Sequence, residues 1–122
     1  MILGIYGAGG LGREVYELAN VINYSNNRWS KIVFIDDSEN VENLRKIPIY
    51  MFSELQKNNS LGDVEVCIAI GEPAIRELLY DKLTTNRIQL ATLIHPDVSI
   101  PESTKIGMGT IICKFVSITC DI

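Results

Sequence analysis

The sequence predicts an α/β protein, in which a small parallel sheet with helices on both faces is followed by the start of a parallel β-helix. Three observations carry this prediction. Short apolar stretches alternate with amphipathic helical stretches over about the first 94 residues, as in parallel sheets with helical crossovers. A turn with the spacing G-x-G-x-x-G follows the first apolar stretch. From Ile94 onward, isoleucine recurs every six residues.

The first crossover lies at the start of the chain. The apolar run Ile2 to Tyr6 predicts a buried strand that ends at the glycines. Apolar residues at helical spacing then predict an amphipathic helix over about residues 13–23. A polar stretch, Tyr24 to Ser30, leads to a second buried strand over Lys31 to Ile35.

Shorter elements continue the alternation. The residues Ile47 to Met51 could form a short third strand. The sequence S-x-x-Q from Ser53 to Gln56 has the form of a capping box, which predicts the start of a short helix. The run Val64 to Ile70 predicts a further buried strand.

A longer helix and a fifth strand complete this part of the chain. Pro73 is well placed as the first helical residue, because its missing N–H is not needed there. The run Leu90 to Ile94 predicts the fifth strand. The apolar face expected on the helix consists of Ile75, Leu78, Leu79 and Leu83.

The predicted ligand crevice lies at the carboxyl ends of strands one, two and four. Glycines there let the backbone and the start of the first helix approach an anion. The chain changes to hexapeptides after one βαβαβ half, which favours a mononucleotide over the dinucleotide that this glycine spacing usually indicates. Asp36 follows Gly12 at about the spacing of a ribose-binding acid, although it and Asp37 could also be solvated turn residues. The candidate binding residues are Gly7, Ala8, Gly9, Gly10, Leu11, Gly12, Asp36, Asp37, Gly71 and Glu72.

The end of the chain has a six-residue period. A period of six suits a parallel β-helix, in which each hexapeptide forms one side of a triangular coil and the isoleucine points inward. An ordinary β-meander is the alternative. The expected domains are therefore residues 1–93 and 94–122. The repeating isoleucines are Ile94, Ile100, Ile106, Ile112 and Ile118, and Val98, Thr104, Thr110, Val116 and Ile122 follow four residues after each.

Four motifs in this order resemble the bacterial sugar O- and N-acyltransferases of the sialic-acid O-acetyltransferase (NeuD-like) type. The motifs are IYGAGGLGREV (5–15), VFIDD (33–37), IAIGEPAIR (68–76) and LIHPDVSI (93–100). The resemblance implies a Rossmann-like domain that holds a UDP- or CMP-linked sugar, with Asp36 or Asp37 accepting hydrogen bonds from the ribose or base. It also implies a left-handed β-helix, usually trimeric, that binds acetyl-CoA and transfers the acetyl group in surface polysaccharide or glycan synthesis.

The sequence departs from this family at three points. The family's catalytic base is a histidine further along the β-helix, whereas the only histidine here, His95, corresponds to a junction residue, for which a structural role is favoured. Leu11 stands where many members have histidine, and Glu72 stands where asparagine or aspartate is more common, while Arg76 matches. A carboxylate at Glu72 would be unfavourable beside a diphosphate.

Five hexapeptides cover less than two triangular coils, and the chain stops before the position of the family's histidine. We therefore expect the N-terminal part of a longer acyltransferase, without transfer activity of its own and able to self-associate through an open β end. Acetyl-CoA is then expected to bind outside this chain. The alternative is a non-catalytic nucleotide- or NAD-binding module whose β tail serves assembly.

Composition excludes several other classes of protein. The net charge is −4 and Lys and Arg are scattered, which argues against nucleic acid. No apolar run approaches the roughly 18 residues of a membrane span, and the early glycine turn excludes a signal peptide, so a cytoplasmic location is expected. Cys67, Cys113 and Cys120 form no C-x-x-C pair and are expected to be reduced structural thiols, with no metal site.

Overall fold

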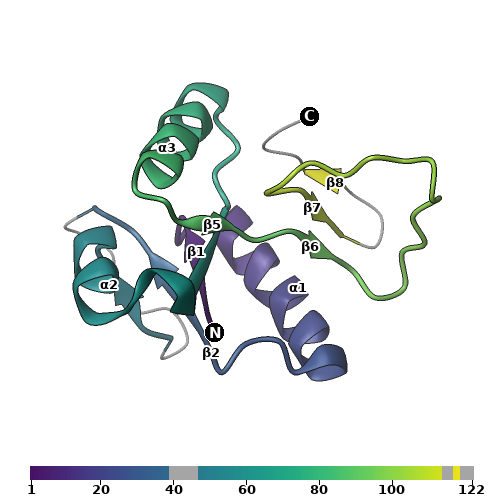
Figure 1. The fold of residues 1–122 in the computed structure, drawn as a ribbon, viewed down its shortest axis with the longest axis horizontal. Coiled ribbons are helices and arrows are strands. Elements are labelled where there is room, and N and C mark those ends of the chain that lie inside the picture. Colours follow the sequence, from purple (N-terminus) through teal and green to yellow (C-terminus); the bar gives the residue numbers. More distant parts are fainter. Residues whose placement is uncertain (39–46, 114–116, 119–122) are drawn as a thin grey trace.

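The computed structural model of the chain describes residues 1–38, 47–113 and 117–118. Its main body is a parallel five-stranded sheet with the strand order β3-β2-β1-β4-β5 (Figure 1). The predicted α/β fold with a parallel sheet is confirmed. The strands are β1 (Ile2–Tyr6), β2 (Lys31–Ile35), β3 (Ile49–Tyr50), β4 (Val64–Ile68) and β5 (Gln89–Leu90).

Helices cover both faces of this sheet. The helix α1 (Gly10–Asn26) lies on one face, and α2 (Phe52–Asn58) and α3 (Pro73–Thr85) lie on the other (Figure 1). A short 3-10 helix, η1 (Leu61–Asp63), precedes β4. Pro73 is the first residue of α3, as predicted.

Two apolar layers follow from this arrangement, because successive side chains of a strand point to opposite faces. On β1, Leu3 and Ile5 pack in the layer with α1, whereas Tyr6 belongs to the layer beneath α2 and α3. Leu3 and Ile5 are fully buried, and each such side chain contributes about 1.5–3 kcal/mol to folding.

The helix α1 is longer than predicted at both ends. It starts at Gly10, inside the glycine turn, and includes Tyr24, which is 95% exposed. It ends where Asn27 adopts the left-handed conformation (φ 49°) and donates its N–H to the carbonyl of Asn23. The polar residues from Tyr24 onward can extend α1 because the apolar face of the helix is already buried. The polar stretch therefore did not mark the C-terminal end of α1.

The helix α2 starts two residues earlier than a cap at Ser53 would place it. Met51 occupies the N-cap position, and the carboxylate of Glu54 accepts a hydrogen bond from the Met51 N–H at 3.0 Å. Ser53 therefore lies within the first turn, and its prediction as the cap is wrong.

The expected apolar face of α3 is only half buried. Leu79 and Leu83 are buried against the sheet, but Ile75 is 45% exposed and Leu78 is 66% exposed. Figure 1 shows the start of α3 rising beyond the strands, so the sheet does not cover its first turns. Leu78 points away from the face that carries Leu79.

The predicted fifth strand divides between two sheets. Only Leu90 of that run belongs to β5, and after Ala91 and Thr92 the chain enters a second sheet. This sheet has the order β6-β7-β8, with β6 (Leu93–Ile94), β7 (Ile111–Ile112) and β8 (Ser117–Ile118). The apolar run could not show this division, because one long buried strand and two short buried strands have the same apolar sequence pattern.

The second sheet has several features of one coil of a β-helix. β6 pairs with β7 in parallel, so that Leu93 lies opposite Ile111, eighteen residues or three hexapeptides later. Backbone hydrogen bonds close turns from His95 to Val98, from Pro101 to Thr104 and from Gly107 to Thr110, at intervals of six residues. However, β8 pairs with β7 antiparallel, which differs from an all-parallel coil. The β-helix stays a prediction.

The repeating isoleucines are not the best-buried residues of this segment. Leu93 and Ile111 are fully buried beside α1, whereas Ile94 and Ile112, one position later, are partly exposed. Neighbouring positions of a strand face opposite sides, and here only the side toward α1 is covered. Ile100 and Ile106 are partly exposed as well. The side chain of Ile118, and Val116, Cys120 and Ile122, lie outside the described residues.

Two cysteines behave as packing residues. Cys67 is fully buried, and Cys113 packs against the apolar layer around α1. Burial and the nearby Glu14 charge raise the pKa of the Cys113 thiol, which disfavours the reactive thiolate. Among the described residues, no cluster of His, Cys, Asp or Glu could hold a metal ion. In the same part of the chain, every helix is too short or too polar to cross a bilayer.

Candidate functional site

Two of the motif glycines serve close backbone packing. Gly7 has a φ of +117°, and a Cβ there would lie 2.8 Å from the carbonyl oxygen of Ala69. A Cβ on Gly12 would lie 1.9 Å from the carbonyl oxygen of Gly7, which is too short for any side chain. These two glycines bring the start of α1 against the end of β1.

The third motif glycine, Gly9, and its neighbour Gly10 face open space. A Cβ on Gly9 would meet no atom within 4 Å, and one on Gly10 would meet only the end of the Arg13 side chain, at 3.9 Å. Gly9 is the N-cap of α1, where no side chain accepts a hydrogen bond and the first turn holds no acid. The N–H groups at the start of a helix attract anions. The start of α1 is therefore open to an anionic ligand.

The start of α3 differs, because its own residue caps it. The carboxylate of Glu72 accepts hydrogen bonds from the backbone N–H groups of Ala74 and Ile75, at 3.3 and 3.2 Å. The charge of Glu72 thus interacts with the dipole of its own helix. A Cβ on the preceding Gly71 would meet nothing within 4 Å.

Asp36 lies next to the glycine turn, as expected. Its Oδ2 accepts a long hydrogen bond from the Ala8 N–H at 3.4 Å, and its Oδ1 accepts one from the Ser38 N–H at 2.9 Å. The Gly7 N–H donates to the carbonyl of Ile35 at 2.8 Å, which joins the two strand ends directly. The structure therefore brings the glycine turn and Asp36 together at the carboxyl edge of the sheet.

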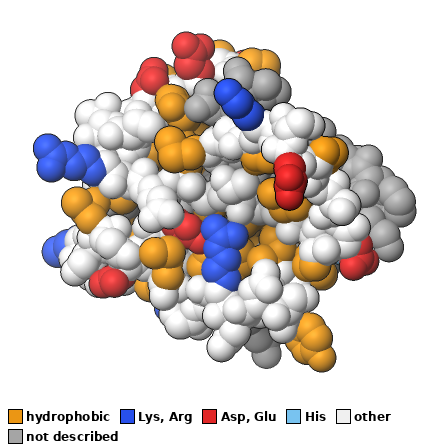
Figure 2. Space-filling model, turned by 45° about the vertical axis from the view of Figure 1, so that its right-hand side comes forward, with side chains coloured by type: hydrophobic (Ala, Val, Ile, Leu, Met, Phe, Trp, Pro, Cys, Tyr) orange, Lys and Arg blue, Asp and Glu red, His pale blue; other side chains and the backbone are white. Residues whose placement is uncertain are grey.

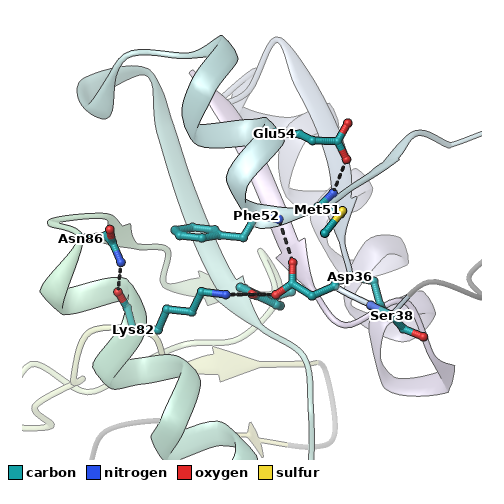
Figure 3. A network of polar contacts seen from close by, with 9 residues as sticks. Asp36, Ser38, Met51, Phe52, Glu54, Lys82 and Asn86 are labelled. Atoms are coloured by element: carbon teal, nitrogen blue, oxygen red, sulfur yellow. Dashed lines mark hydrogen bonds and ion pairs between the residues drawn. The ribbon is translucent and has the colours of Figure 1, made fainter.

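Asp37 has a different environment from Asp36. Its carboxylate accepts hydrogen bonds from the Tyr6 hydroxyl, from the Phe52 N–H at 2.9 Å and from the Lys82 ammonium at 3.0 Å. In Figure 3, dashed lines run from the labelled residues Phe52 and Lys82 to this carboxylate. Lys82 also donates to the Tyr6 oxygen at 2.8 Å. Asp37 thus links β1, β2, α2 and α3.

The network changes the acidity of its members. Burial raises the pKa of the Tyr6 hydroxyl, and its hydrogen bond to Asp37 and the charges of Asp37 and Asp36 raise it further. Burial alone would raise the pKa of Asp37, but the hydrogen bonds from Tyr6, Phe52 and Lys82 outweigh this and lower it. Asp37 therefore stays ionised and Tyr6 stays protonated at neutral pH.

Neither Leu11 nor His95 has the surroundings of a catalytic group. Leu11 packs against the apolar layer around α1. His95 follows β6, and its Nδ1 accepts a hydrogen bond from the Asp97 N–H at 3.0 Å, so its geometry is that of a turn residue.

Sequence patterns did not predict a role for Tyr6, Phe52 or Lys82 at this site. They come from three separate elements, and no local spacing relates them to Asp37. The one available signal was the polar hydroxyl of Tyr6 at the end of an otherwise apolar strand.

A separate hollow of about 300 Å³ lies on the side of the sheet that carries α2. Leu55, Leu61 and Ile88 are among its lining residues, which are all uncharged. None of the crevice residues lines it, and it lacks the charge that would hold an anion. On the face shown in Figure 2, basic and acidic side chains are scattered singly, without a continuous basic patch.

Known proteins with a similar sequence or structure include an N-acetyltransferase and an acetyltransferase domain. UDP-N-acetylbacillosamine N-acetyltransferase of Bacillus subtilis (strain 168) is 31% identical over 114 residues, which are 90% of this chain and 50% of the relative. The acetyltransferase domain of PglB from Neisseria gonorrhoeae FA1090 matches with a TM-score of 0.74 and 28% identity, over 88% of this chain and 51% of that one. The same domain has been solved in complex with acetyl coenzyme A.

WeeI from Acinetobacter baumannii AYE matches with a TM-score of 0.77 and 28% identity, over 93% of this chain and 52% of that one. The chain thus spans about half the length of these relatives. The resemblance to sugar acyltransferases is confirmed. Because the model of the PglD N-terminal domain matches residues 3–83, from β1 to the end of α3, the chain belongs to the PglD N-terminal domain family.

Proposed function

We propose that this chain is the substrate-binding part of an acetyl-CoA-dependent sugar N-acetyltransferase in glycan biosynthesis, and that it binds a UDP-linked amino sugar. The observation that carries the proposal is the uncapped start of α1 at Gly9, next to Asp36. The names of the relatives, one for a UDP-linked sugar and others for acetyltransferase domains, support the choice of substrate.

The crevice suits a sugar diphosphate for electrostatic reasons. The diphosphate would lie against the N–H groups of residues 9–11, where the helix dipole stabilises a negative charge by about 0.3–1 kcal/mol at an exposed site. Asp36 would accept a hydrogen bond from the ribose or the base. Glu72 repels such a ligand less than the sequence indicated, because its carboxylate interacts with its own helix.

In the proposed reaction, the sugar amine attacks the thioester carbonyl of acetyl-CoA. A C–N bond forms, the C–S bond breaks, and coenzyme A leaves as the thiol while a base removes the proton of the amine. His95 is a poor candidate for this base, since its Nδ1 is already hydrogen-bonded within a turn. We place the acyl-transfer centre and the acetyl-CoA site outside the crevice, and we expect this chain alone to show no transfer.

The proposal has three further parts. The boundary between the two domains lies at residues 93 and 94, close to the start of the second sheet. The whole enzyme is a homo-oligomer, a trimer if its β-helix is complete. It acts in the cytoplasm, because both substrates are charged nucleotide derivatives that do not cross a bilayer unaided.

Calorimetric titration with UDP, CMP, NAD and acetyl-CoA tests the binding proposal. We expect UDP to bind and Gly9→Val to weaken its binding at least tenfold, because the new side chain would fill the space in front of the helix. Gly62→Val is the matched control, since a Cβ at Gly62 also meets nothing within 4 Å but lies on η1. Binding of NAD without UDP would instead support the non-catalytic module.

A further inference from the structure

We propose that Asp37 is a positioning residue, which holds the two walls of the crevice in place and does not contact the ligand. One wall is the glycine turn after β1, and the other is Asp36 at the end of β2. The part of this inference that concerns ligand affinity rests on the proposed function, whereas the part that concerns the walls does not.

The carboxylate of Asp37 is already occupied by contacts within the protein. Its Oδ1 accepts the Phe52 N–H, and its Oδ2 accepts both the Tyr6 hydroxyl and the Lys82 ammonium. A carboxylate offers about four acceptor sites, and three are used here. Among the residues that the structure describes, the carboxylate of Asp36 contacts only backbone N–H groups, one of them at 3.4 Å. Asp36 is therefore the acid that remains available to a ligand.

Asp37 and its partner Tyr6 are direct chain neighbours of the two walls of the crevice. Tyr6 directly precedes Gly7, and Asp37 directly follows Asp36. The bond between Tyr6 and Asp37 therefore joins the residues next to both walls of the crevice. It reinforces the backbone contact from Gly7 to Ile35 on the same two strands.

Lys82 and Phe52 fix this junction to the helices. The Lys82 ammonium lies 5.4 Å from the ring centre of Tyr6 and 4.8 Å from that of Phe52, and the two rings are stacked with their centres 5.9 Å apart. The ion pair of Lys82 with Asp37 is more than a third exposed, so solvent screens it and it adds little stability. Because Lys82 donates to both Asp37 and the Tyr6 oxygen, we infer that this ion pair serves to hold the two residues in place.

Amide hydrogen exchange on the ligand-free chain tests the positioning directly. In Asp37→Asn, we expect exchange at least fivefold faster at residues 7–12 and 36–38, with unchanged exchange in β4 and β5. Lys82→Met, which keeps the carboxylate, should give a smaller change at the same residues and serves if Asp37→Asn does not fold. Asp63→Asn, an exposed acid on η1, is the control. Unchanged exchange at the two walls, or an equal increase throughout the sheet, would overturn the proposal.

Titration with UDP then separates positioning from contact. We expect Asp37→Asn to bind UDP about five- to tenfold more weakly, and Tyr6→Phe and Lys82→Met to weaken binding in the same direction. The double variant Asp37→Asn with Lys82→Met should be no worse than Asp37→Asn alone, because both act through one network. Weaker binding with unchanged exchange would make Asp37 a ligand contact and overturn the proposal, as would wild-type affinity in Asp37→Asn. If the unaltered chain binds no UDP, the proposed function fails, and the exchange experiment still decides the role of Asp37.

Discussion

At the scale of single residues, the glycines of one motif divide between two tasks. Gly7 and Gly12 have no room for a side chain, whereas Gly9 and Gly10 face open space. The motif spacing predicted a ligand site for all of them. It could not separate the two tasks, because the separation depends on which backbone atoms lie opposite each glycine.

This division predicts that the same substitution destabilises the protein to very different extents at the two kinds of glycine. Gly12→Ala should lower the free energy of unfolding by about 3 kcal/mol, because its Cβ would overlap the Gly7 carbonyl oxygen. Gly9→Ala should cost no more than about 1 kcal/mol, since only the preference for glycine at an N-cap is lost. Urea unfolding measures both values. Equal effects would show that Gly7 and Gly12 are further apart than described.

Asp37 makes stability depend on pH in the acid range. Its pKa in the folded state lies below the ordinary 3.8, because the hydrogen bonds from Tyr6, Phe52 and Lys82 outweigh burial. The stabilisation is therefore fully present above pH 3.8 and is lost as the pH falls through the lower folded-state value. The difference in melting temperature between the unaltered chain and Asp37→Asn should shrink below about pH 4. A difference that stays constant from pH 7 to pH 3 would contradict this.

At the scale of elements, hydrophobic periodicity predicted the bounds of the first two strands better than it predicted which helix residues are buried. The first two strands have the predicted bounds, because a buried strand of a parallel sheet is apolar throughout. Periodicity also predicted α3, but not that Ile75 and Leu78 would be exposed. A sequence pattern shows which face of a helix is apolar, and it does not show how far the sheet extends beneath it.

The cap of α3 is a property of this element that can be tested. Glu72→Ala should lower the free energy of unfolding by about 1 kcal/mol, because the N–H groups of Ala74 and Ile75 lose their acceptor. Glu72→Asn should retain most of the stability, since asparagine is a good N-cap residue. Thermal unfolding of the two variants side by side measures the difference. If Glu72→Ala is as stable as the unaltered chain, the carboxylate does not cap α3 in solution.

At the scale of the whole molecule, a second polar network connects the two sheets. Glu65 on β4 is only 2% exposed, accepts a hydrogen bond from the Trp29 indole N–H at 2.5 Å and forms an ion pair with Arg28 at 3.0 Å. Arg28 also donates to the carbonyl of Thr92 at 2.9 Å, just before β6, and its guanidinium lies 4.7 Å from the Trp29 ring centre. Arg28 thus joins the buried acid of the first sheet to the entry of the second.

Local sequence patterns do not reveal this network. The apolar run around Glu65 predicts a buried strand, which is confirmed, but Trp29 lies 36 residues away from Glu65 in the chain. Contacts over such separations depend on the strand order, which places β4 beside β1 at the centre of the sheet. The hexapeptide period, in contrast, can be read from the sequence alone, because it relates residues that are only six positions apart.

The network predicts that Glu65 stabilises the molecule and that Arg28 acts mainly on the second sheet. Glu65→Ala should lower the free energy of unfolding by about 2 kcal/mol, because it leaves the Trp29 N–H and the Arg28 guanidinium without their buried acceptor. Trp29 is the single tryptophan, so its fluorescence should shift to longer wavelength in this variant.

Arg28→Met keeps Glu65 bonded to Trp29 but removes the bond to Thr92, so we expect faster amide exchange at Leu93 and Ile111 with little change in β1. Lys31→Met, which removes an exposed cation nearby in sequence, is the control. If Arg28→Met leaves exchange at Leu93 unchanged, then the packing of Leu93 and Ile111 against α1 holds the second sheet without Arg28.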